Sequence, residues 1–288
     1  MAGLVLQLIN GVLLGGLYAL TALGLTAQFG VMRIVNFAYG TLFMVGGYAG
    51  WVIQSTLHTP YVLTVVIAMA IMFVIGTGLE FVAFRPLRAS EERTILLGLG
   101  IMSLGPALII LTFGSANQLL PSGVTGLFES GPIVVAYERI ATVALAAVLI
   151  LAVAAFVKFT PAGRAVRAVA DDPVRAGLLG ISPKPVYNIT FGVTTALSGG
   201  AACLLATSWQ VTPTIDSAAL LISFVVVIVG GIGSIAGTLV AGVLIGVLTT
   251  LGQVYVSQAL APAAPFAALI LILLLRPQGL FGRKTRAA

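Results

Sequence analysis

GRAVRAVADDPVRAGLLGISPKP (residues 163–185) is a short charged stretch that lies between two long apolar ones. The chain has 14 basic and 8 acidic residues in all. Six of these charged residues lie in this stretch: Arg164, Arg167, Asp171, Asp172, Arg175 and Lys184. Charge collected between two apolar runs is typical of a cytoplasmic loop that connects two membrane spans. The stretch and its flanks therefore indicate a membrane protein.

The composition of the whole chain agrees with a membrane environment. Its 288 residues are 59% hydrophobic and their mean hydropathy is +1.15, whereas soluble domains are about 45–50% apolar. A globular protein of this length has too little interior for so much apolar surface, so lipid must solvate most of it. Apolar runs of helix length predict an all-α, polytopic membrane helix bundle.

Nine apolar runs are candidates for membrane spans, since a helix needs about 20 residues to cross a hydrocarbon layer of about 30 Å. The runs are 4–29, 37–54, 61–84, 94–113, 139–158, 188–207, 219–236, 237–256 and 263–275. The seventh and eighth are fused and the last is short, so we expect eight or nine spans in a single membrane domain over residues 1–288. The first run is interpreted as a membrane helix and not as a signal peptide, because no basic residue precedes Arg33.

The basic residues predict which side of the membrane each loop faces. We place four segments in the cytoplasm: 30–36, 85–93, 158–187 and the tail from residue 276. These segments hold 13 of the 14 basic residues, and only Arg139 lies on the other side. Cytoplasmic loops carry such a basic excess, so the C-terminus is expected inside. The long loop 114–138 is expected to form a small external hairpin or cap.

The charged stretch contains signals that begin and end a short helix. Asp172 before Pro173 is a strong start signal, because Asp is a favoured N-cap and Pro fits the first helical position. Gly180 is placed to end the helix, with Ile181 available for the accompanying hydrophobic contact. The helix has about two turns, which is too short to be stable alone in water.

An apolar side indicates that this helix packs on something. This side consists of Val174, Leu178, Leu179 and Ile181, and each would contribute on the order of 1.5–3 kcal/mol if fully buried. Two interpretations are open: the helix lies on lipid or on the protein's own helices, or it docks into a groove of a cytoplasmic partner. A mere connector would not need the apolar side, which favours the partner.

Four parts of the chain resemble a known family of permeases. They are GRAVRAVADDPVRAGLLGI (163–181), NGVLLGGLYALTALGLTAQFGVMRIVNFAYGTLFMVGGYAG (10–50), VVVIVGGIGSIAGTLVAGVLIGVL (225–248) and LLLRPQGLFG (273–282). The first is similar to the cytoplasmic coupling loop of permease subunits in ATP-binding-cassette (ABC) importers. Together they resemble the branched-chain amino acid (LivH-type) permeases. Tyr39 departs from the family pattern, which has His at this place in the NFA-x-G element.

The resemblance implies a permease subunit in the cytoplasmic membrane of a bacterium or archaeon. It implies two cytoplasmic ABC ATPase subunits, a second homologous permease chain in a heterodimeric pore, an external substrate-binding protein and membrane lipid as partners. The partner ATPases would use ATP, and no cofactor is expected on this chain. The implied cargo is a branched-chain or other hydrophobic amino acid; urea, amides or another small solute are the alternative. The residues expected to couple to the ATPases lie in the loop at about 159–187: Asp172, Pro173, Val174, Arg175, Leu178, Leu179, Gly180 and Ile181.

Two elements are candidates for the translocation path or a gate. RIVNFAYG (33–40) places Asn36 and Gly40 at a break between two spans. A polar break at membrane depth is tolerated where it is buried in protein or lines a cavity, and an ordinary tight turn is the alternative. The second element lies between the seventh and eighth runs, where a gating role competes with close helix packing through small residues. It holds Gly230, Gly231 and Gly233.

Glu80 is the one acidic residue that we expect inside a span, about one turn from Arg85. Ion-coupled carriers use such residues near the midplane, but here we expect a structural pair with a nearby arginine. An ion-coupled secondary transporter is therefore the less favoured alternative. Gln253, Tyr255 and Ser257 are weaker candidates for lining an outer mouth.

Several other classes of protein are disfavoured. No lysine follows the glycine pattern of a phosphate-binding loop, so ATP hydrolysis has to occur on another chain. His58 and Cys203 are the only residues of their kind, so neither a Ser-His-Asp triad nor a His- or thiolate-ligated metal site is expected. The basic residues form no stripe with interleaved aromatics, so no nucleic acid partner is expected. A passive channel of the aquaporin type would need paired Asn-Pro-Ala loops, which the sequence lacks.

Overall fold

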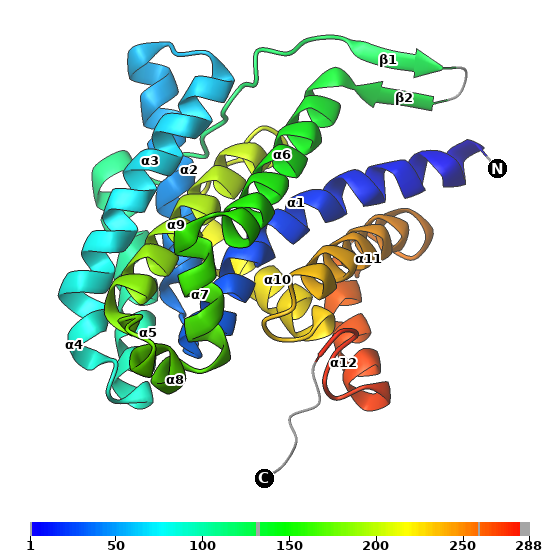
Figure 1. Ribbon diagram of the computed structural model, residues 1–288. Coiled ribbons are helices and arrows are strands. Elements are labelled where there is room, and N and C mark those ends of the chain that lie inside the picture. Colours follow the sequence, from blue (N-terminus) through cyan, green and yellow to red (C-terminus); the bar gives the residue numbers. More distant parts are fainter. Residues whose placement is uncertain (1, 131–132, 259, 283–288) are drawn as a thin grey trace.

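A computed structural model describes residues 2–130, 133–258 and 260–282 of the chain. Its helices form a bundle, and a two-stranded hairpin lies beside one end of that bundle (Figure 1). The predicted helical, multi-span architecture is therefore confirmed, with the hairpin as an addition to it. Three basic residues of the predicted cytoplasmic tail, Arg283, Lys284 and Arg286, lie outside the described residues.

Most elements follow one another along the chain with short connections, and the longest connection, 114–126, joins α5 to β1. They are α1 (Ala2–Met32), α2 (Ala38–Leu57), α3 (Tyr61–Leu79), the π-helix η1 (Glu80–Phe84), α4 (Arg85–Leu87), α5 (Glu91–Phe113), β1 (Leu127–Ser130), β2 (Ile133–Ala136), α6 (Tyr137–Phe159), α7 (Pro161–Asp171), α8 (Pro173–Leu178), α9 (Pro183–Leu205), α10 (Ile215–Gly230), α11 (Ile235–Tyr255), the 3-10 helix η2 (Ala261–Ala263) and α12 (Ala264–Leu275). The first predicted loop, 30–36, is shorter than expected, because α1 continues to Met32.

Each of the nine predicted apolar runs falls largely within a helix. Within the described chain, six helices are long and apolar enough to cross a membrane: α1, α3 with its extension, α5, α6, α9 and α11. α2 has 20 residues, but its Gly, Thr, Tyr and Gln residues lower its hydropathy, and α10 and α12 are shorter. The fused seventh and eighth runs are separated by a turn at 231–234, which lies within the glycine-containing stretch expected between them.

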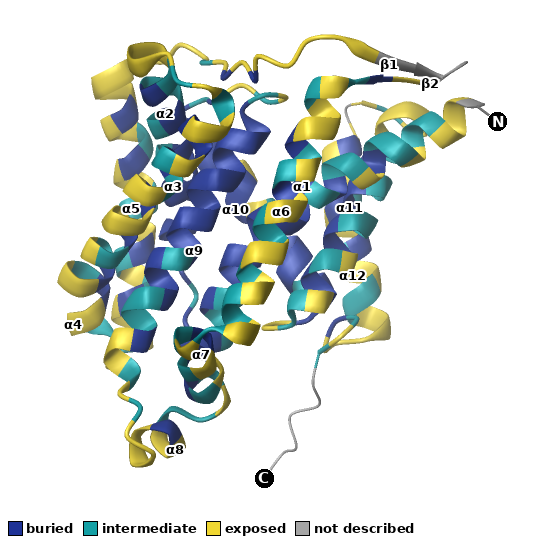
Figure 2. Cartoon of the chain, turned by 45° about the horizontal axis from the view of Figure 1, so that its top comes forward, coloured by how far each residue is buried: buried dark blue, intermediate teal, exposed yellow. Residues whose placement is uncertain are grey.

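The bundle has a buried centre and a surface of apolar side chains. In α9, 83% of the most apolar window is buried, whereas the corresponding values are 28% for α3, 22% for α5 and 11% for α6. α2 and α9 lie in the interior of the bundle, and α5 and α6 expose much of their surface (Figure 2). The exposed side chains of the outer helices are largely apolar, as expected for helices in contact with lipid. α2 can have a lower hydropathy than the outer helices, because other helices cover it and shield its polar residues from lipid.

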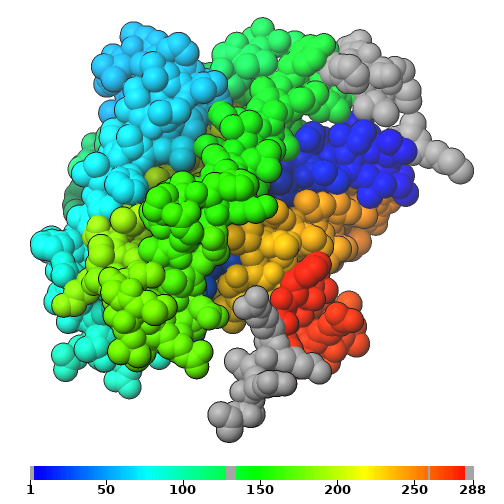
Figure 3. Space-filling model, viewed as in Figure 1, coloured from blue at the N-terminus to red at the C-terminus, as the bar shows by residue number. Residues whose placement is uncertain are grey.

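Small residues allow the closest helix contacts. α1 and α11 run side by side (Figure 3), and a Cβ atom added to Gly246 would lie 2.3 Å from the Cα atom of Gly15. Farther along the same pair, the hydroxyl oxygens of Thr26 and Thr238 are hydrogen-bonded at 2.7 Å. α3 and α9 approach in the same way, since a Cβ on Gly192 would lie 2.5 Å from Thr77. These contacts confirm that the small-residue spacing serves close packing.

The hairpin and the short helices α7 and α8 lie at opposite ends of the bundle (Figure 2). The antiparallel strands β1 and β2 pair from Leu127 with Ala136 to Ser130 with Ile133, so the predicted hairpin in loop 114–138 is confirmed. The N-terminus of α1 lies near this hairpin end, whereas the last described residues after α12 lie toward the other end (Figure 1). The segments that were grouped as cytoplasmic are thus separated from the hairpin by the length of the bundle.

Candidate functional site

Asp172 begins α8 as its N-cap. One carboxylate oxygen accepts hydrogen bonds from the backbone N–H groups of Val174 and Arg175, at 2.9 and 3.1 Å, and Pro173 occupies the first helical position. The second oxygen lies 3.1 Å from Nε of Arg175. The Arg175 N–H, followed by that of Val174, lowers the pKa of the Asp172 carboxyl. The predicted start of the helix is confirmed.

Gly180 ends the same helix. Its φ is +81°, a left-handed conformation that glycine adopts without a steric penalty. Its N–H donates to the carbonyl of Gly177 at 3.1 Å, and the N–H of Ile181 donates to the carbonyl of Ala176 at 2.9 Å. This pair of bonds is the Schellman motif, so α8 is a six-residue helix that is closed at both ends.

The apolar side of α8 points away from the rest of the chain. The exposed fractions of Val174, Leu178 and Leu179 are 73%, 84% and 80%, whereas Ala176 is 2% exposed on the inner side. These three side chains therefore do not pack on the protein's own helices, which for them removes one of the two surfaces considered in the first interpretation. Ile181, the fourth residue of the predicted apolar side, is instead partly buried against the protein's own core. A lipid surface and a docking partner are left to cover them.

α7 fastens α8 to the bundle. Its residues Gly163, Val166 and Val169 are buried, while Arg164 and Arg167 are exposed on the opposite face. Thr160 caps its start by accepting a hydrogen bond from the N–H of Gly163 at 2.9 Å. α7 is thus a short helix with both arginines on one face, and its opposite, buried face packs on the bundle.

Arg33 links α7 to the break between α1 and α2. Its Nη2 atom donates to the carbonyl oxygens of Ala170 and Asp171, at 3.4 and 3.2 Å. These are carbonyls of the last turn of α7, where cationic side chains are favoured. Arg33 itself has a φ of +55°, so the first residue after α1 turns sharply. The sequence analysis placed Arg33 in the expected cytoplasmic segment 30–36 but found no signal for its hydrogen-bond partners.

Asn36 is buried just before α2. Its Oδ1 atom accepts a hydrogen bond from the N–H of Ala38 at 3.0 Å, and its Nδ2 atom donates to Oε1 of Gln28 at 3.4 Å. Gly40 lies against α10, where an added Cβ would be 2.2 Å from the carbonyl oxygen of Asp216. Tyr39 donates its hydroxyl to the carbonyl of Thr21 at 2.5 Å. Asn36 and Gly40 are therefore parts of a buried break, and their place on a translocation path stays a prediction.

The glycine turn between α10 and α11 is fastened to the C-terminal tail. Gly231 and Gly233 have φ values of +99° and +79°, and Gly230 packs directly on Gly237 of α11. The N–H groups of Leu280 and Phe281 donate to the carbonyls of Val229 and Gly230, at 2.8 and 3.1 Å. Close packing accounts for these glycines, and a gating role stays a prediction.

Glu80 is fully buried and forms a pair with an arginine, as predicted. The partner is Arg88, not Arg85, which lies over the ring of Phe81. Nδ2 of Asn188 in α9 donates to the Glu80 carboxylate at 2.7 Å. The Arg88 guanidinium also stacks on a ring of α9, that of Tyr187, at 4.3 Å from its centroid. Glu80 thus ties α3 to α9 as a structural group.

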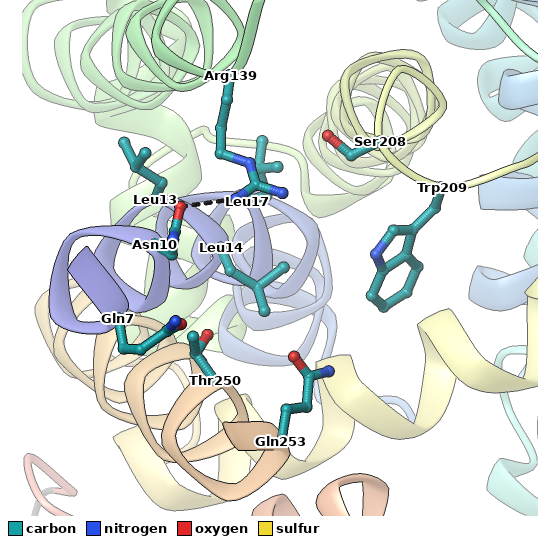
Figure 4. A pocket seen from close by; sticks show the side chains of 10 residues that line it. All are labelled: Gln7, Asn10, Leu13, Leu14, Leu17, Arg139, Ser208, Trp209, Thr250 and Gln253. Carbon is teal, nitrogen blue, oxygen red and sulfur yellow. Dashed lines mark hydrogen bonds between the residues drawn. The ribbon is translucent and has the colours of Figure 1, made fainter. Parts of the chain in front are cut away.

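A cavity of about 200 Å³ lies at the hairpin end of the bundle. Figure 4 shows side chains from α1, α6, α11 and the connection after α9 around it. Its polar lining comes from Gln7, Asn10, Arg139, Ser208, Thr250 and Gln253. Gln253 was a weak candidate for an outer mouth, but Tyr255 is not among the lining residues. For the other polar lining residues, the sequence offered one signal: Gln7 and Asn10 lie one helical turn apart in an otherwise apolar run.

The described residues contain no group of three or more His, Cys, Asp or Glu side chains that could hold a metal ion. Their candidate features are instead a capped helix, a buried break, a glycine turn and a polar cavity. Comparison with known proteins gives these features a context.

The chain matches, over residues 7–275, the family described as branched-chain amino acid transport system / permease component. It is 34% identical to the high-affinity branched-chain amino acid transport system permease protein LivH of Escherichia coli (strain K12), over 96% of this chain and 95% of that protein. LivH of Salmonella typhimurium is equally similar over the same shares. The permease protein BraD of Pseudomonas aeruginosa is 31% identical, again over 96% of this chain and 95% of that protein. No solved structure matches the chain.

Proposed function

The chain belongs to the family of permease components of branched-chain amino acid transport systems, and we propose that it is the membrane-spanning permease subunit of an ATP-driven ABC importer. The cargo is a branched-chain or similar hydrophobic amino acid, because the LivH and BraD relatives carry that substrate class in their names and align with this chain almost from end to end. An external binding protein delivers the cargo, and the permease passes it to the cytoplasm.

The exposed apolar side of α8 is the observation that carries this proposal. A six-residue helix with a cap at each end presents Leu178 and Leu179 outward, each at least 80% exposed. Such a helix gains stability by burying those side chains. A groove on an ATPase subunit would cover them, and the capped ends would let α8 move as a rigid unit.

A continuous set of contacts supports transmission from α8 into the bundle. α8 follows α7 directly at Asp172, and the last carbonyls of α7 are held by Arg33. Asn36, three residues after Arg33, lies in the buried break that leads into α2. When ATP binding draws the ATPase subunits together, the push on α8 therefore reaches the α1–α2 break. Asn36 and Gly40 border the path in this proposal, and Gly230, Gly231 and Gly233 form the adjoining turn that follows the motion.

The proposed assembly has nine membrane crossings in this chain. They are the six long apolar helices together with α2, α10 and α12, which is preceded by η2. The N-terminus and the hairpin lie outside, and the C-terminus and α8 lie in the cytoplasm, as the distribution of basic residues favours. The pore is completed by a second, homologous permease chain in a heterodimer, and two ABC ATPase subunits bind from the cytoplasm.

ATP is hydrolysed on those partner subunits in this proposal, and this chain serves as a transport subunit. The test is reconstitution of the chain with its partner permease, ATPases and binding protein in liposomes. Uptake of radiolabelled leucine that requires both ATP and the binding protein is the expected result. A photo-crosslinker placed at position 178 should reach the ATPase. Uptake by this chain alone under an ion gradient, or crosslinks from position 178 that reach lipid and no protein, would overturn the proposal.

A further inference from the structure

We propose that the cavity at the hairpin end is a receiving site for the carboxylate and aliphatic side chain of an amino acid. We call it the outer pocket; Arg139 supplies its charge. The inference rests on the proposed function in one respect: only the proposed orientation makes the hairpin end, and with it the pocket, face the outside of the cell. It adds a residue-level site for the cargo, which neither the buried break nor the glycine turn provides.

The charge of the outer pocket favours an anionic group. Arg139 is exposed at the first turn of α6, and no acidic side chain is among the residues that line the pocket. One of its terminal nitrogens donates to Oδ1 of Asn10 at 2.7 Å, which fixes the guanidinium at the pocket wall. A guanidinium has five N–H donors, so the others are available to a carboxylate in a bidentate arrangement.

Other parts of the outer pocket lining suit an aliphatic group. Leu14 and Leu17 of α1 form part of the wall, and Leu17 is buried. The indole of Trp209 closes the side across from α1, and Figure 4 shows Arg139, Trp209 and Gln253 around one common space. An apolar wall with a few convergent polar groups is the usual composition of a small-molecule site. Gln253 offers an amide oxygen to the ammonium group of a zwitterion.

The size of the outer pocket fits a small solute. Its volume is about 200 Å³, below the range of about 300–1,000 Å³ that is usual for sites of drug-sized ligands. Its lining comes from four separate segments, so a shift of α1 against α6 or α11 changes the spacing of its groups. The site can therefore accept cargo in one state of the bundle and release it in another.

The experiment measures protection of a thiol in the outer pocket. Ser208 lines the pocket and is exposed, whereas the native Cys203 is fully buried, so Ser208→Cys provides a selective reporter. The complete transporter carrying Ser208→Cys is alkylated with a small maleimide in nanodiscs, without the binding protein. L-leucine is the probe, and L-leucinamide, which lacks the carboxylate, is its matched control. Each rate is compared with the rate of the same variant without probe.

We expect L-leucine to slow alkylation and L-leucinamide to have little effect at the same concentration. Arg139→Gln should raise the leucine concentration for half-protection by about tenfold or more, because a charge-assisted hydrogen bond is lost. Arg139→Lys should retain part of the protection. Glu138→Gln, which changes a neighbouring charge outside the pocket lining, should leave it unchanged.

Three results would overturn the outer pocket as a cargo site. They are equal protection by leucine and leucinamide, no effect of Arg139→Gln, and protection that follows anionic lipid in the nanodisc instead of leucine. The same preparations are then assayed for ATP-driven uptake with the binding protein. Leucine uptake without thiol protection contradicts the pocket alone, whereas protection without ATP-driven uptake of any branched-chain amino acid contradicts the proposed function alone.

Discussion

The guanidinium of Arg88 forms an ion pair with the carboxylate of Glu80, eight residues earlier in the chain. Glu80 is fully buried, whereas the side chain of Arg88 remains 20% exposed. Asn188 donates a second hydrogen bond to the same carboxylate at 2.7 Å. Burying a charge is costly unless it is paired and hydrogen-bonded, and here both conditions are met. The pair therefore holds the end of α3 against α9.

Removal of one member of this pair should destabilise the protein strongly. Arg88→Met leaves the Glu80 carboxylate buried with only Asn188, and breaking a buried ion pair costs about 3–5 kcal/mol. The double variant Glu80→Gln with Arg88→Met removes both charges and should recover most of that loss. Thermal unfolding in detergent measures both. A single variant that unfolds at the same temperature as the double one would contradict the structural role.

Leu178→Asp should uncouple ATP hydrolysis from transport while the bundle stays folded. The side chain is 84% exposed, so its loss does not disturb the chain itself. Removing the apolar contact of one leucine should weaken docking by about tenfold or more, because full burial of such a side chain contributes about 1.5–3 kcal/mol. Co-purification of the ATPase and leucine uptake measure this effect. Leu178→Met keeps the apolar surface and serves as the control; normal uptake with Leu178→Asp would count against the docking role.

Asp172→Ala should reduce coupling less than Leu178→Asp does, because it removes the N-cap of α8 and leaves the apolar side in place. Asp172→Asn retains a favoured capping residue and is the matched control. The readout is ATP hydrolysis stimulated by the loaded binding protein in the reconstituted complex. Equal rates for Asp172→Ala and the unchanged protein would show that the cap does not contribute.

The same residue predicts how coupling responds to acid. Backbone N–H groups lower the pKa of the Asp172 carboxyl, so the cap's stabilising contribution is present above the ordinary carboxyl pKa. It is lost only as the pH falls through the lower pKa of the folded protein. Between about pH 5 and pH 8 the contribution of the cap should therefore be constant. A difference between the unchanged protein and Asp172→Asn that varies within this range would contradict the assignment.

Gly246→Ala should destabilise the contact between α1 and α11. The added Cβ would lie 2.3 Å from a backbone atom of Gly15, and backbone cannot move aside as a flexible side chain does. Overpacking of this kind costs about 1–3 kcal/mol or more. Gly100→Ala is the control, since Gly100 lies within α5 with no atom near its missing side chain. Unfolding in detergent should separate the two variants, and equal stabilities would show that α1 and α11 adjust freely.

Much of the fold could be predicted because its signals are local. Apolar runs of about 20 residues located the helices, and Asp172, Pro173 and Gly180 located both ends of α8 correctly. Each of these signals depends on a few neighbouring residues. The turn at 231–234 lies between the seventh and eighth runs, as expected, but its bounds could not be predicted, because Gly230 to Gly237 are compatible with helix as well as with a turn.

The partners of the charged residues could not be predicted in the same way. Glu80 was expected to pair with a nearby arginine, but the sequence did not decide which one. A π-helix changes the angular position of the residues that follow it, and the structure pairs Glu80 with Arg88. Arg33 contacts carbonyls 137 and 138 residues away, and backbone acceptors have no signature in a sequence. The outer pocket combines four segments that are distant in the sequence. The sequence therefore identified Arg139 as the one basic residue expected outside, but not the residues that surround it.

The π-helix Glu80–Phe84 has a consequence for the comparison of relatives. A π-turn holds one more residue than an α-turn, and each residue of an α-helix turns the chain by about 100°. A homologue with a one-residue deletion between these positions would straighten the segment into regular α-helix and rotate its counterpart of Arg88 away from α9. An alignment that ignores such an insertion or deletion would match Arg88 with an arginine of the homologue, although the two side chains face different neighbours.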